Sequence, residues 1–302
     1  MRKDISIFTV DVEDWFHILD VASTPPVSRW DELPGRVEQN TRRILSLCEE
    51  HGVRATFFFL GWVARRYPHL VKEAAAKGHE IASHGFSHRL VYEMSPDEAL
   101  DDMRESKRLL EDLAGMQVHG FRAPGFSVLD EAPWFFETLL EAGFTYDSSV
   151  FPGPRGHGGM RSNRFGPYIV SVGEKSLVEF PVSLIKFAGR NICFSGGGYL
   201  RLFPYRFVRY LAEKTLASGR PVMFYVHPRE IDPKHPRLPM SLFREFKSYV
   251  NLASTERKLR KLFNDFTLVS CKGFIGQYME SFPVVKLGAT AGGNDPGVSS
   301  AR

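Results

Sequence analysis

Short apolar runs alternate with helical stretches along most of the chain, and this alternation restricts the possible folds more than any other feature. We expect strands over residues 5–10, 55–60, 78–83, 118–121, 144–146, 177–184, 222–226 and 266–269. Between them, apolar residues at helical spacing predict helices over residues 36–50, 61–77, 95–113, 131–142, 204–217 and 241–263. This order predicts an α/β fold with a parallel sheet or barrel.

The chain shows no internal repeat and no linker that would divide it. We therefore expect one domain over residues 1–285. Residues 151–176 are rich in Gly, Pro and Arg and predict a long loop, which in a compact domain is often functional. From Ala289 onward the chain consists mostly of small and polar residues, so residues 286–302 are predicted to form a disordered tail.

The composition is that of an ordinary globular protein and excludes several classes. The 302 residues are 43% hydrophobic and carry a formal net charge of +4. Lys and Arg are spread among acidic residues, so no basic patch indicates a nucleic-acid partner. No stretch approaches the roughly 20 apolar residues that a membrane-spanning helix needs.

The cysteines and the amino-terminal run indicate the compartment. Cys48, Cys193 and Cys271 are far apart in the sequence, and their odd number argues against a disulfide framework and for a reducing environment. The apolar run over residues 5–10 is followed at once by acidic residues, which is too early for a signal peptide. We therefore expect a cytoplasmic protein.

Two histidines follow the strand that is predicted to end at Ser83. His84 and His88 are four residues apart, and on a helical turn this spacing would place both imidazoles on one face. Two neutral imidazoles suit a borderline-soft cation such as zinc. Two surface histidines are the alternative interpretation, but the position directly after a strand favours a functional site, as in other α/β enzymes.

Polar residues recur at the ends of the predicted strands. Each of them alone could be a helix cap, a surface ion pair or a histidine whose hydrogen bonds are satisfied locally. In a parallel barrel, however, all the carboxyl ends of the strands lie on one face. The sequence therefore predicts that one site contains Asp11, His84, Arg122, Asp147 and His227.

Together these motifs resemble the polysaccharide deacetylase family, the NodB-homology domain of carbohydrate esterase family 4. The matching runs appear in the family's order and are Thr9-Val10-Asp11-Val12-Glu13-Asp14, His84-Gly85-Phe86-Ser87-His88, Arg122-Ala123-Pro124-Gly125-Phe126, Asp147-Ser148-Ser149 and Tyr225-Val226-His227. The segments around them look most like the branch found beside bacterial exopolysaccharide gene clusters. The resemblance implies a distorted (β/α)7 barrel with long loops at its C-terminal face.

The resemblance also implies an activity, the hydrolysis of N-acetyl groups on sugars, and a divalent metal, for which zinc is the first choice. Such a metal lowers the pKa of a bound water, which is a poor nucleophile at neutral pH. By resemblance, Asp11 is the general base and Arg122 holds it ionised and oriented. His227 would protonate the leaving amine, and Asp147 would keep His227 protonated. The candidates for stacking on sugar rings are Trp15, Phe126, Phe151 and Tyr199, although core packing is the commoner role of such residues.

Two positions depart from the family's pattern. Its first motif usually has two adjacent aspartates, whereas Val12 follows Asp11 here, so the third metal ligand beside the two histidines is either Glu13 or Asp14. Residues two apart in an extended segment point the same way, which favours Glu13 because it shares the face of Asp11. The last motif usually has Leu where this chain has Tyr225, which places a hydroxyl near the acetyl pocket.

The expected substrate is an N-acetylated amino sugar in a polysaccharide or in its lipid-linked precursor. A lipid-linked precursor would imply peripheral contact with a membrane. One alternative is hydrolysis of a cyclic amide, a reaction of metal-free relatives that lack the histidine pair. A second alternative is a carbohydrate-binding barrel without activity, which would have no need to keep both Asp11 and His227.

Overall fold

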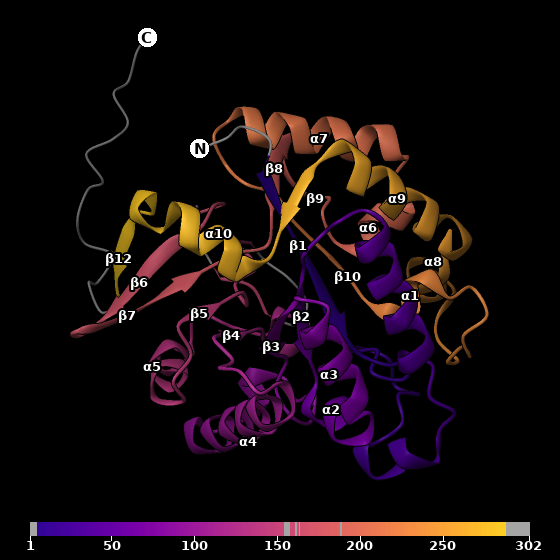
Figure 1. Cartoon of the computed structure of the whole chain (residues 1–302), viewed down its shortest axis with the longest axis horizontal. Coiled ribbons are helices and arrows are strands. Elements are labelled where there is room, and N and C mark those ends of the chain that lie inside the picture. Colours follow the sequence, from indigo (N-terminus) through magenta and orange to yellow (C-terminus); the bar gives the residue numbers. More distant parts are fainter. Residues whose placement is uncertain (1–4, 154–157, 161, 163, 188, 288–302) are drawn as a thin grey trace.

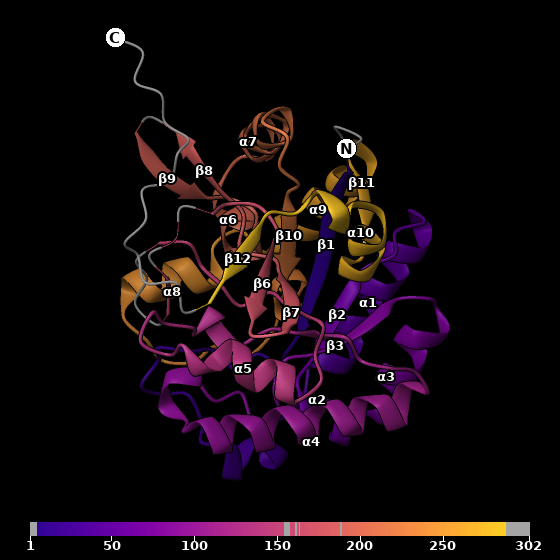
Figure 2. The same cartoon turned by 90° about the vertical axis from the view of Figure 1, so that its left-hand side faces the viewer.

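The fold is built around one twisted, mostly parallel sheet with helices packed outside it (Figures 1 and 2). The computed structural model describes residues 5–153, 158–160, 162, 164–187 and 189–287. The sheet has the order β10-β1-β2-β3-β4-β5-β7-β6-β12, and β11 also pairs with β1. The disordered tail predicted over residues 286–302 lies almost entirely outside the described residues.

Seven neighbouring strands of the sheet are parallel, as the alternation of strands and helices predicts. In sheet order they are β10 (Met223–Val226), β1 (Ile5–Val12), β2 (Thr56–Phe59), β3 (Glu80–Ser83), β4 (Gly120–Phe121), β5 (Tyr146–Asp147) and β7 (Lys175–Glu179). All eight residues of β1 are buried, because the strand is covered on both faces. The fold is thus the expected α/β domain, with the geometry of a distorted and open (β/α)7 barrel.

The barrel is open between β10 and β7. Among the described residues no ladder joins these two strands, and single contacts bridge the space instead. The backbone amide of Met223 donates to Ser183 Oγ at 2.9 Å, and that of Tyr225 donates to the carbonyl of Ser195 at 3.2 Å. The remaining strands are β6 (Tyr168–Val172), β8 (Leu184–Phe187), β9 (Arg190–Cys193), β11 (Thr267–Val269) and β12 (Val284–Lys286).

Helices connect the strands and bury their apolar faces against the sheet. They are α1 (Val37–Glu50), α2 (Gly61–Arg66), α3 (Pro68–Ala76), α4 (Pro96–Ala114), α5 (Trp134–Glu141), α6 (Gly197–Leu202), α7 (Tyr205–Ala217), α8 (Leu242–Tyr249), α9 (Thr255–Asp265) and α10 (Cys271–Tyr278). The described part of the chain also contains the short 3₁₀ helices η1 (Val27–Glu32), η2 (Val91–Glu93), η3 (Pro124–Phe126), η4 (Pro228–Ile231), η5 (Leu252–Ser254) and η6 (Met279–Ser281). Ser95 and Glu98 form the reciprocal hydrogen bonds of a capping box at the start of α4.

The structure corrects the predicted helix and strand boundaries at several points. The helix predicted over 61–77 is two helices, because Pro68 begins α3 and disfavours a helical residue before it. The helix predicted over 241–263 is also two, separated at Asn251, whose φ of 53° is left-handed. The strand predicted over 177–184 ends at Glu179, and β6 lies inside the predicted loop over 151–176. Among the described residues, no helix is both long and apolar enough to cross a membrane.

Candidate active site

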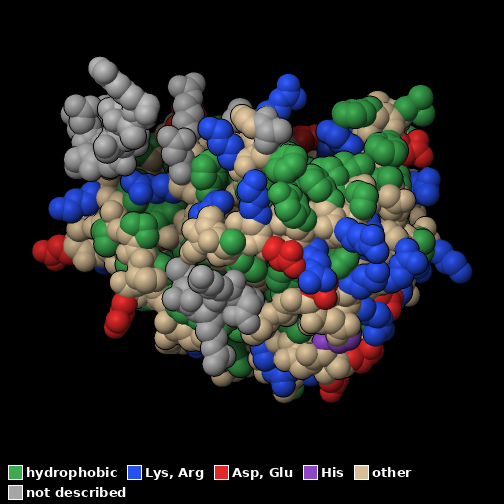
Figure 3. All heavy atoms as spheres, turned by 90° about the horizontal axis from the view of Figure 1, so that it is seen from above, with side chains coloured by type: hydrophobic (Ala, Val, Ile, Leu, Met, Phe, Trp, Pro, Cys, Tyr) green, Lys and Arg blue, Asp and Glu red, His purple; other side chains and the backbone are tan. Residues whose placement is uncertain are grey.

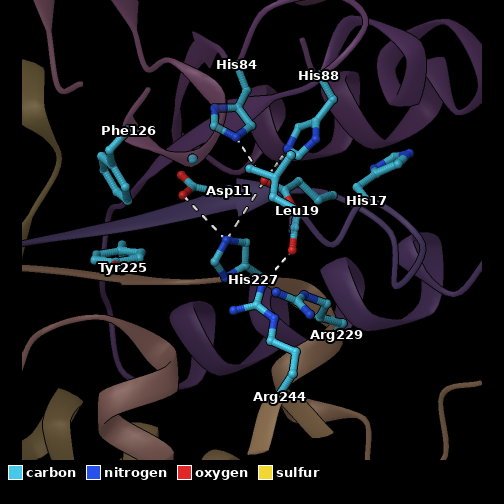
Figure 4. A pocket seen from close by; sticks show the side chains of 12 residues that line it. Asp11, His17, Leu19, His84, His88, Phe126, Tyr225, His227, Arg229 and Arg244 are labelled. Atoms are coloured by element: carbon cyan, nitrogen blue, oxygen red, sulfur yellow. Dashed lines mark hydrogen bonds and ion pairs between the residues drawn. The ribbon is translucent and has the colours of Figure 1, made fainter. Parts of the chain in front are cut away.

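A cavity of about 130 Å³ lies beyond the carboxyl ends of β1, β3 and β10 (Figure 4). The loops that follow these strands supply most of its lining, because parallel strands deliver their ends to one edge of the sheet. The lining residues are Asp11, Glu13, His17, Leu19, His84, His88, Gly125, Phe126, Tyr225, His227, Arg229 and Arg244. Four of the five residues predicted at strand ends therefore gather in one place, since Arg122 lies directly behind Asp11 and only Asp147 points elsewhere.

Glu13, His84 and His88 form a compact group that could hold a metal ion. Glu13 Oε1 lies 2.9 Å from His84 Nε2 and 3.0 Å from His88 Nε2, and all three side chains are buried. Burial alone would raise the pKa of Glu13, but His88, His227 and the hydrogen bond with His84 together lower this pKa well below its usual range. Glu13 is therefore a carboxylate, the form that can bind a cation.

The second nitrogen of His84 fixes the orientation of its ring. Nδ1 lies 2.7 Å from the backbone carbonyl oxygen of Arg122, which can only accept, so Nδ1 carries a proton. His84 Nε2 and Glu13 Oε1 are 2.9 Å apart, so a proton on Nε2 or a cation must lie between these two atoms. Two imidazole nitrogens and one carboxylate oxygen, with an outer hydrogen bond of this kind, suit a divalent metal such as zinc.

The histidine pair lies on a loop, whereas the spacing predicted a helical turn. Gly85 and His88 have φ values of 71° and 57°, which no helix allows. The carboxylate of Asp102 on α4 holds the loop by accepting from the backbone amides of Phe86 at 2.7 Å and Ser87 at 3.2 Å. The loop therefore depends on α4 packing beside it.

Asp14, the other candidate for the third ligand, does not join this group. Its carboxylate accepts from the backbone amides of Trp15 at 2.8 Å, Arg36 at 2.8 Å and Val37 at 3.1 Å, so it holds the loop before α1. Burial raises the pKa of Asp14 despite these hydrogen bonds. Its own backbone amide donates to His17 Nδ1 at 3.1 Å, which adds a second restraint on this loop.

Asp11 is fixed by a buried arginine. Arg122 is fully buried, and its Nη1 donates to Asp11 Oδ1 at 2.6 Å and to Thr9 Oγ1 at 2.8 Å. Its other guanidinium nitrogens reach Ser148, at 3.3 Å for the carbonyl and 3.0 Å for Oγ. The guanidinium carbon also lies 4.1 Å from the ring centroid of Phe58. Asp11 Oδ2 remains directed toward His227, whose Nε2 is 3.8 Å away.

The carboxylate beside His227 belongs to Glu230, which the sequence analysis missed. Glu230 Oε2 lies 3.5 Å from His227 Nδ1, and Oε2 also accepts from the His227 backbone amide at 3.0 Å. Burial alone would lower the pKa of His227, but Glu13 and Glu230 outweigh burial and raise this pKa above its ordinary value. The signal was present in His227-Pro228-Arg229-Glu230, the spacing of a capping box at a short helix start.

Asp147 does not contact His227, because β5 lies next to β7 and not next to β10. Asp147 Oδ1 accepts from Ser149 Oγ at 2.6 Å, and its register partner on β7 is Glu179. Burial raises the pKa of Asp147 to about 6. Burial and the nearby charge of Asp147 together raise the pKa of Glu179 well above its usual range. The raised pKa values favour a protonated carboxyl in this pair, and we expect the two carboxyls to share that proton. Ser149 Oγ in turn accepts from the backbone amide of Ala123, so the pair supports the segment after Arg122.

Two of the four residues predicted to stack on sugar rings line a cavity or groove, and two do not. Phe126 lines the cavity, and its ring lies 5.1 Å from that of Tyr225, the residue that departs from the family's pattern. Tyr199 lines a neighbouring groove. Trp15 and Phe151 are buried and do not line the cavity or the groove, which is consistent with packing roles.

Two family models match the chain. Residues 27–146 match the model described as polysaccharide deacetylase, and residues 148–275 match a model described as a domain of unknown function, DUF3473. The first range contains His84, His88 and Arg122, and the second contains His227 and Glu230. Asp11 and Glu13 precede both ranges.

Curated relatives are similar over part of the chain. A peptidoglycan-N-acetylglucosamine deacetylase of Bacillus cereus is 34% identical over 90 residues, which are 30% of this chain and 33% of the relative. A peptidoglycan deacetylase of Helicobacter pylori is 30% identical over 132 residues, 44% of this chain and 41% of the relative. The chain thus spans about a third to two fifths of the length of these relatives.

Solved structures share the fold over almost the whole chain. A protein of Mycobacterium smegmatis described as a polysaccharide deacetylase has a TM-score of 0.62 at 22% identity, covering 92% of this chain and 90% of its own. Puue allantoinase has a TM-score of 0.61 at 17% identity, covering 94% of this chain and 93% of its own. At these identities the likeness concerns the fold alone.

The proton shared by Asp147 and Glu179 predicts a pH-dependent stability. The folded protein keeps this proton, whereas the unfolded chain loses it above its ordinary carboxyl pKa of about 4. The free energy of unfolding therefore falls as the pH rises from about 4 through the raised pKa values of the folded state. Glu179→Gln removes one carboxyl, and we expect its stability relative to wild type to improve by about 1–3 kcal/mol between pH 5 and pH 8.

Urea unfolding at pH 5, 6.5 and 8 measures this difference. Glu174→Gln is the matched control, because Glu174 is exposed in the turn between β6 and β7. The control should follow wild type at every pH. A Glu179→Gln variant whose stability difference from wild type stays constant with pH would contradict the shared proton.

Proposed function

We propose that this chain, whose residues 27–146 belong to the polysaccharide deacetylase family, is a metal-dependent hydrolase that removes N-acetyl groups from an amino sugar in a polysaccharide. The observation that carries the proposal is the buried group of Glu13, His84 and His88 beside Asp11 and His227. It combines a donor set for a divalent cation with an acid and a base at one cavity, which amide hydrolysis requires.

A divalent metal fits the residues that would hold it, since His84 Nδ1 donates to the Arg122 carbonyl and Nε2 faces the Glu13 carboxylate at 2.9 Å. Glu13, His84 and His88 would be its protein ligands. When bound, a divalent cation would lower the pKa of water and polarise the amide carbonyl. The side chains of Phe126 and Tyr225 form the apolar wall beside this position, where an acetyl methyl group can lie.

Asp11 is proposed as the general base. Its Oδ1 is occupied by Arg122, so Oδ2 is the oxygen that takes the proton of the attacking water. Arg122 keeps the carboxylate in one orientation and favours its charged form. As the water oxygen bonds to the acetyl carbon, negative charge develops on the carbonyl oxygen, and a divalent cation held by Glu13, His84 and His88 would stabilise that charge.

His227 is proposed as the general acid. The amide nitrogen cannot leave as an anion, so it must gain a proton as the C–N bond breaks and acetate and a free amine form. Glu13 and Glu230 outweigh burial and raise the pKa of His227, which favours the protonated imidazole that an acid needs, and Glu230 supports that form from the Nδ1 side. In Figure 4, Asp11 lies between the histidine pair and His227, so base and acid face one reacting group.

We propose three finer points on more limited support. The metal is zinc, because two nitrogen donors and one oxygen donor suit it. The polymer is an exopolysaccharide or its lipid-linked precursor, as the resemblance implies. The reaction takes place in the cytoplasm, since Cys48, Cys193 and Cys271 are buried and no disulfide joins them, as in a reducing compartment.

We also propose peripheral contact with a membrane through α8. Leu242, Phe243 and Phe246 are 85%, 69% and 54% exposed, and Lys247 and Arg237 lie beside them. Figure 3 shows hydrophobic side chains gathered on the face seen from above, bordered by Lys and Arg. Apolar side chains with adjacent cations suit an anionic bilayer surface.

Sedimentation with vesicles that contain an anionic phospholipid tests this contact. Wild type should pellet with the vesicles, and Phe243→Asp should reduce the bound fraction several-fold because it removes apolar area and adds repulsive charge. Equal binding of the two proteins, or no binding of wild type, would exclude α8 as the contact.

Three variants separate the proposed roles at the active site. Asp11→Asn should keep its metal and lose turnover by about 10²–10⁴-fold, because it lacks only the base. Glu13→Gln should lose metal, whereas Asp14→Asn should retain it, because the Asp14 carboxylate binds backbone amides. Elemental analysis after dialysis gives the metal content, and release of acetate from N-acetylated oligosaccharides gives the turnover.

Circular dichroism of each variant controls for folding. Metal retained by Glu13→Gln but lost by Asp14→Asn would transfer the ligand role to Asp14. Turnover near the wild-type rate in Asp11→Asn would remove Asp11 as the base.

A further inference from the structure

A second, larger hollow continues from the active-site cavity. This groove has a volume of about 490 Å³ and shares Tyr225, His227, Arg229 and Arg244 with the cavity. Its remaining lining comes from the loop before η1 and from α6, η4 and α8: Ile18, Asp20, Gly198, Tyr199, Arg201, Leu202, Glu230, Lys247, Ser248 and Val250. A polymer chain whose amino sugar occupies the cavity would extend along it.

The groove is rich in cations. The described residues that line it include four basic side chains and two carboxylates. One of the basic side chains, Arg201, pairs with a carboxylate of the protein itself. Arg201 is buried, lies 3.3 Å from Glu230 Oε1, and donates to the backbone carbonyls of Ser248 and Val250. Beyond that pair, Arg229 and Lys247 add positive charge to the lining of the groove.

Two of these cations are aimed at the mouth of the active site. Figure 4 shows Arg229 and Arg244 on the side of His227 that is opposite the histidine pair. No carboxylate forms an ion pair with Arg229 among the described residues, and its Nε is buried without a hydrogen-bond partner there. Arg244 is held in place by donating through Nη2 to the carbonyl of Leu19 at 2.6 Å.

We propose that this groove, formed by Arg229, Arg244, Lys247 and Tyr199, binds an anionic group of the substrate next to the N-acetylated sugar. The proposal rests on the deacetylase function and narrows its substrate to a charged glycan. Guanidinium groups pair with the oxygens of a carboxylate or a phosphate, and Tyr199 offers an aromatic face to the sugar that carries them. A neutral glycan would offer Arg229 and Lys247 no opposite charge.

Binding to the full-length, metal-loaded Asp11→Asn variant tests the proposal without turnover. Hyaluronan tetrasaccharide, in which N-acetylglucosamine alternates with glucuronic acid, is compared with the neutral chitotetraose by isothermal titration calorimetry. We expect hyaluronan to bind at least tenfold more tightly at low salt, and this advantage to shrink at high salt. UDP-N-acetylglucosamine supplies a diphosphate in a third arm, and tighter binding of this probe than of hyaluronan would identify the anion as phosphate.

Further substitutions locate the effect. Arg229→Gln and Lys247→Gln, each added to Asp11→Asn, should reduce the anionic advantage several-fold. Arg237→Gln is the matched control, since Arg237 lies near α8 but lines the other hollow. Equal affinity for charged and neutral probes, no binding of any probe, or an equal loss in the control would overturn the proposal. Anionic preference without acetate release by wild type would instead overturn the deacetylase function and leave the groove intact.

Discussion

The buried ion pair between Arg122 and Asp11 is the interaction on which the site most depends. Arg122 is fully buried, and a lone guanidinium in such a place would cost several kcal/mol. The guanidinium donates hydrogen bonds to Thr9 and Asp11 on β1 and to Ser148 after β5. Because Arg122 itself follows β4, these bonds fix the ends of β1, β4 and β5 relative to one another. The same residue supplies the carbonyl that orients His84. One arginine thus positions the proposed base with its side chain and a proposed metal ligand with its backbone.

Charge compensation explains how the other buried carboxylates are placed. Glu13 faces two imidazoles, Glu230 faces His227 and Arg201, and the pKa of Glu230 is lowered to about 2 although burial alone would raise it. Asp11, Glu13 and Glu230 therefore each face an arginine or an imidazole. Asp147 and Glu179 are the exception, because they face each other and solve the same problem by sharing a proton. Among the described residues, neither Arg229 nor Lys247 of the groove forms an ion pair, which makes a charged substrate the natural complement.

Much of this arrangement could be predicted from the sequence, and the reason is topological. Asp11 lies at the end of an apolar strand and His84, Arg122 and His227 each follow one, and a parallel sheet brings such positions to one edge whatever the details of packing. The extended-segment argument also agrees with the structure in placing Glu13, and not Asp14, beside the histidines. The break between α2 and α3 could also have been predicted from Pro68, because proline disfavours a helical residue before it.

The contacts that could not be predicted depend on which strands and helices lie side by side in the fold. The sequence showed Asp147 at a strand end, but not that β5 pairs with β7, which gives Asp147 a carboxyl partner far along the chain. It likewise showed Glu230 only as a charged residue after His227, whereas the 3₁₀ turn η4 folds its carboxylate back onto the imidazole. The left-handed residues of the His84–His88 loop depend on Asp102 of α4, a contact that spacing alone cannot reveal.

The central claim is that this cavity hydrolyses an N-acetyl group with a metal held by Glu13, His84 and His88. The most direct measurement follows acetate and free amine from an N-acetylated tetrasaccharide with wild-type protein, before and after removal of metal by a chelator. The account predicts equal amounts of acetate and amine, loss of both after chelation, and recovery on adding one equivalent of zinc. Acetate release that is unaffected by chelation, or no release from any N-acetylated glycan by the metal-loaded protein, would contradict it.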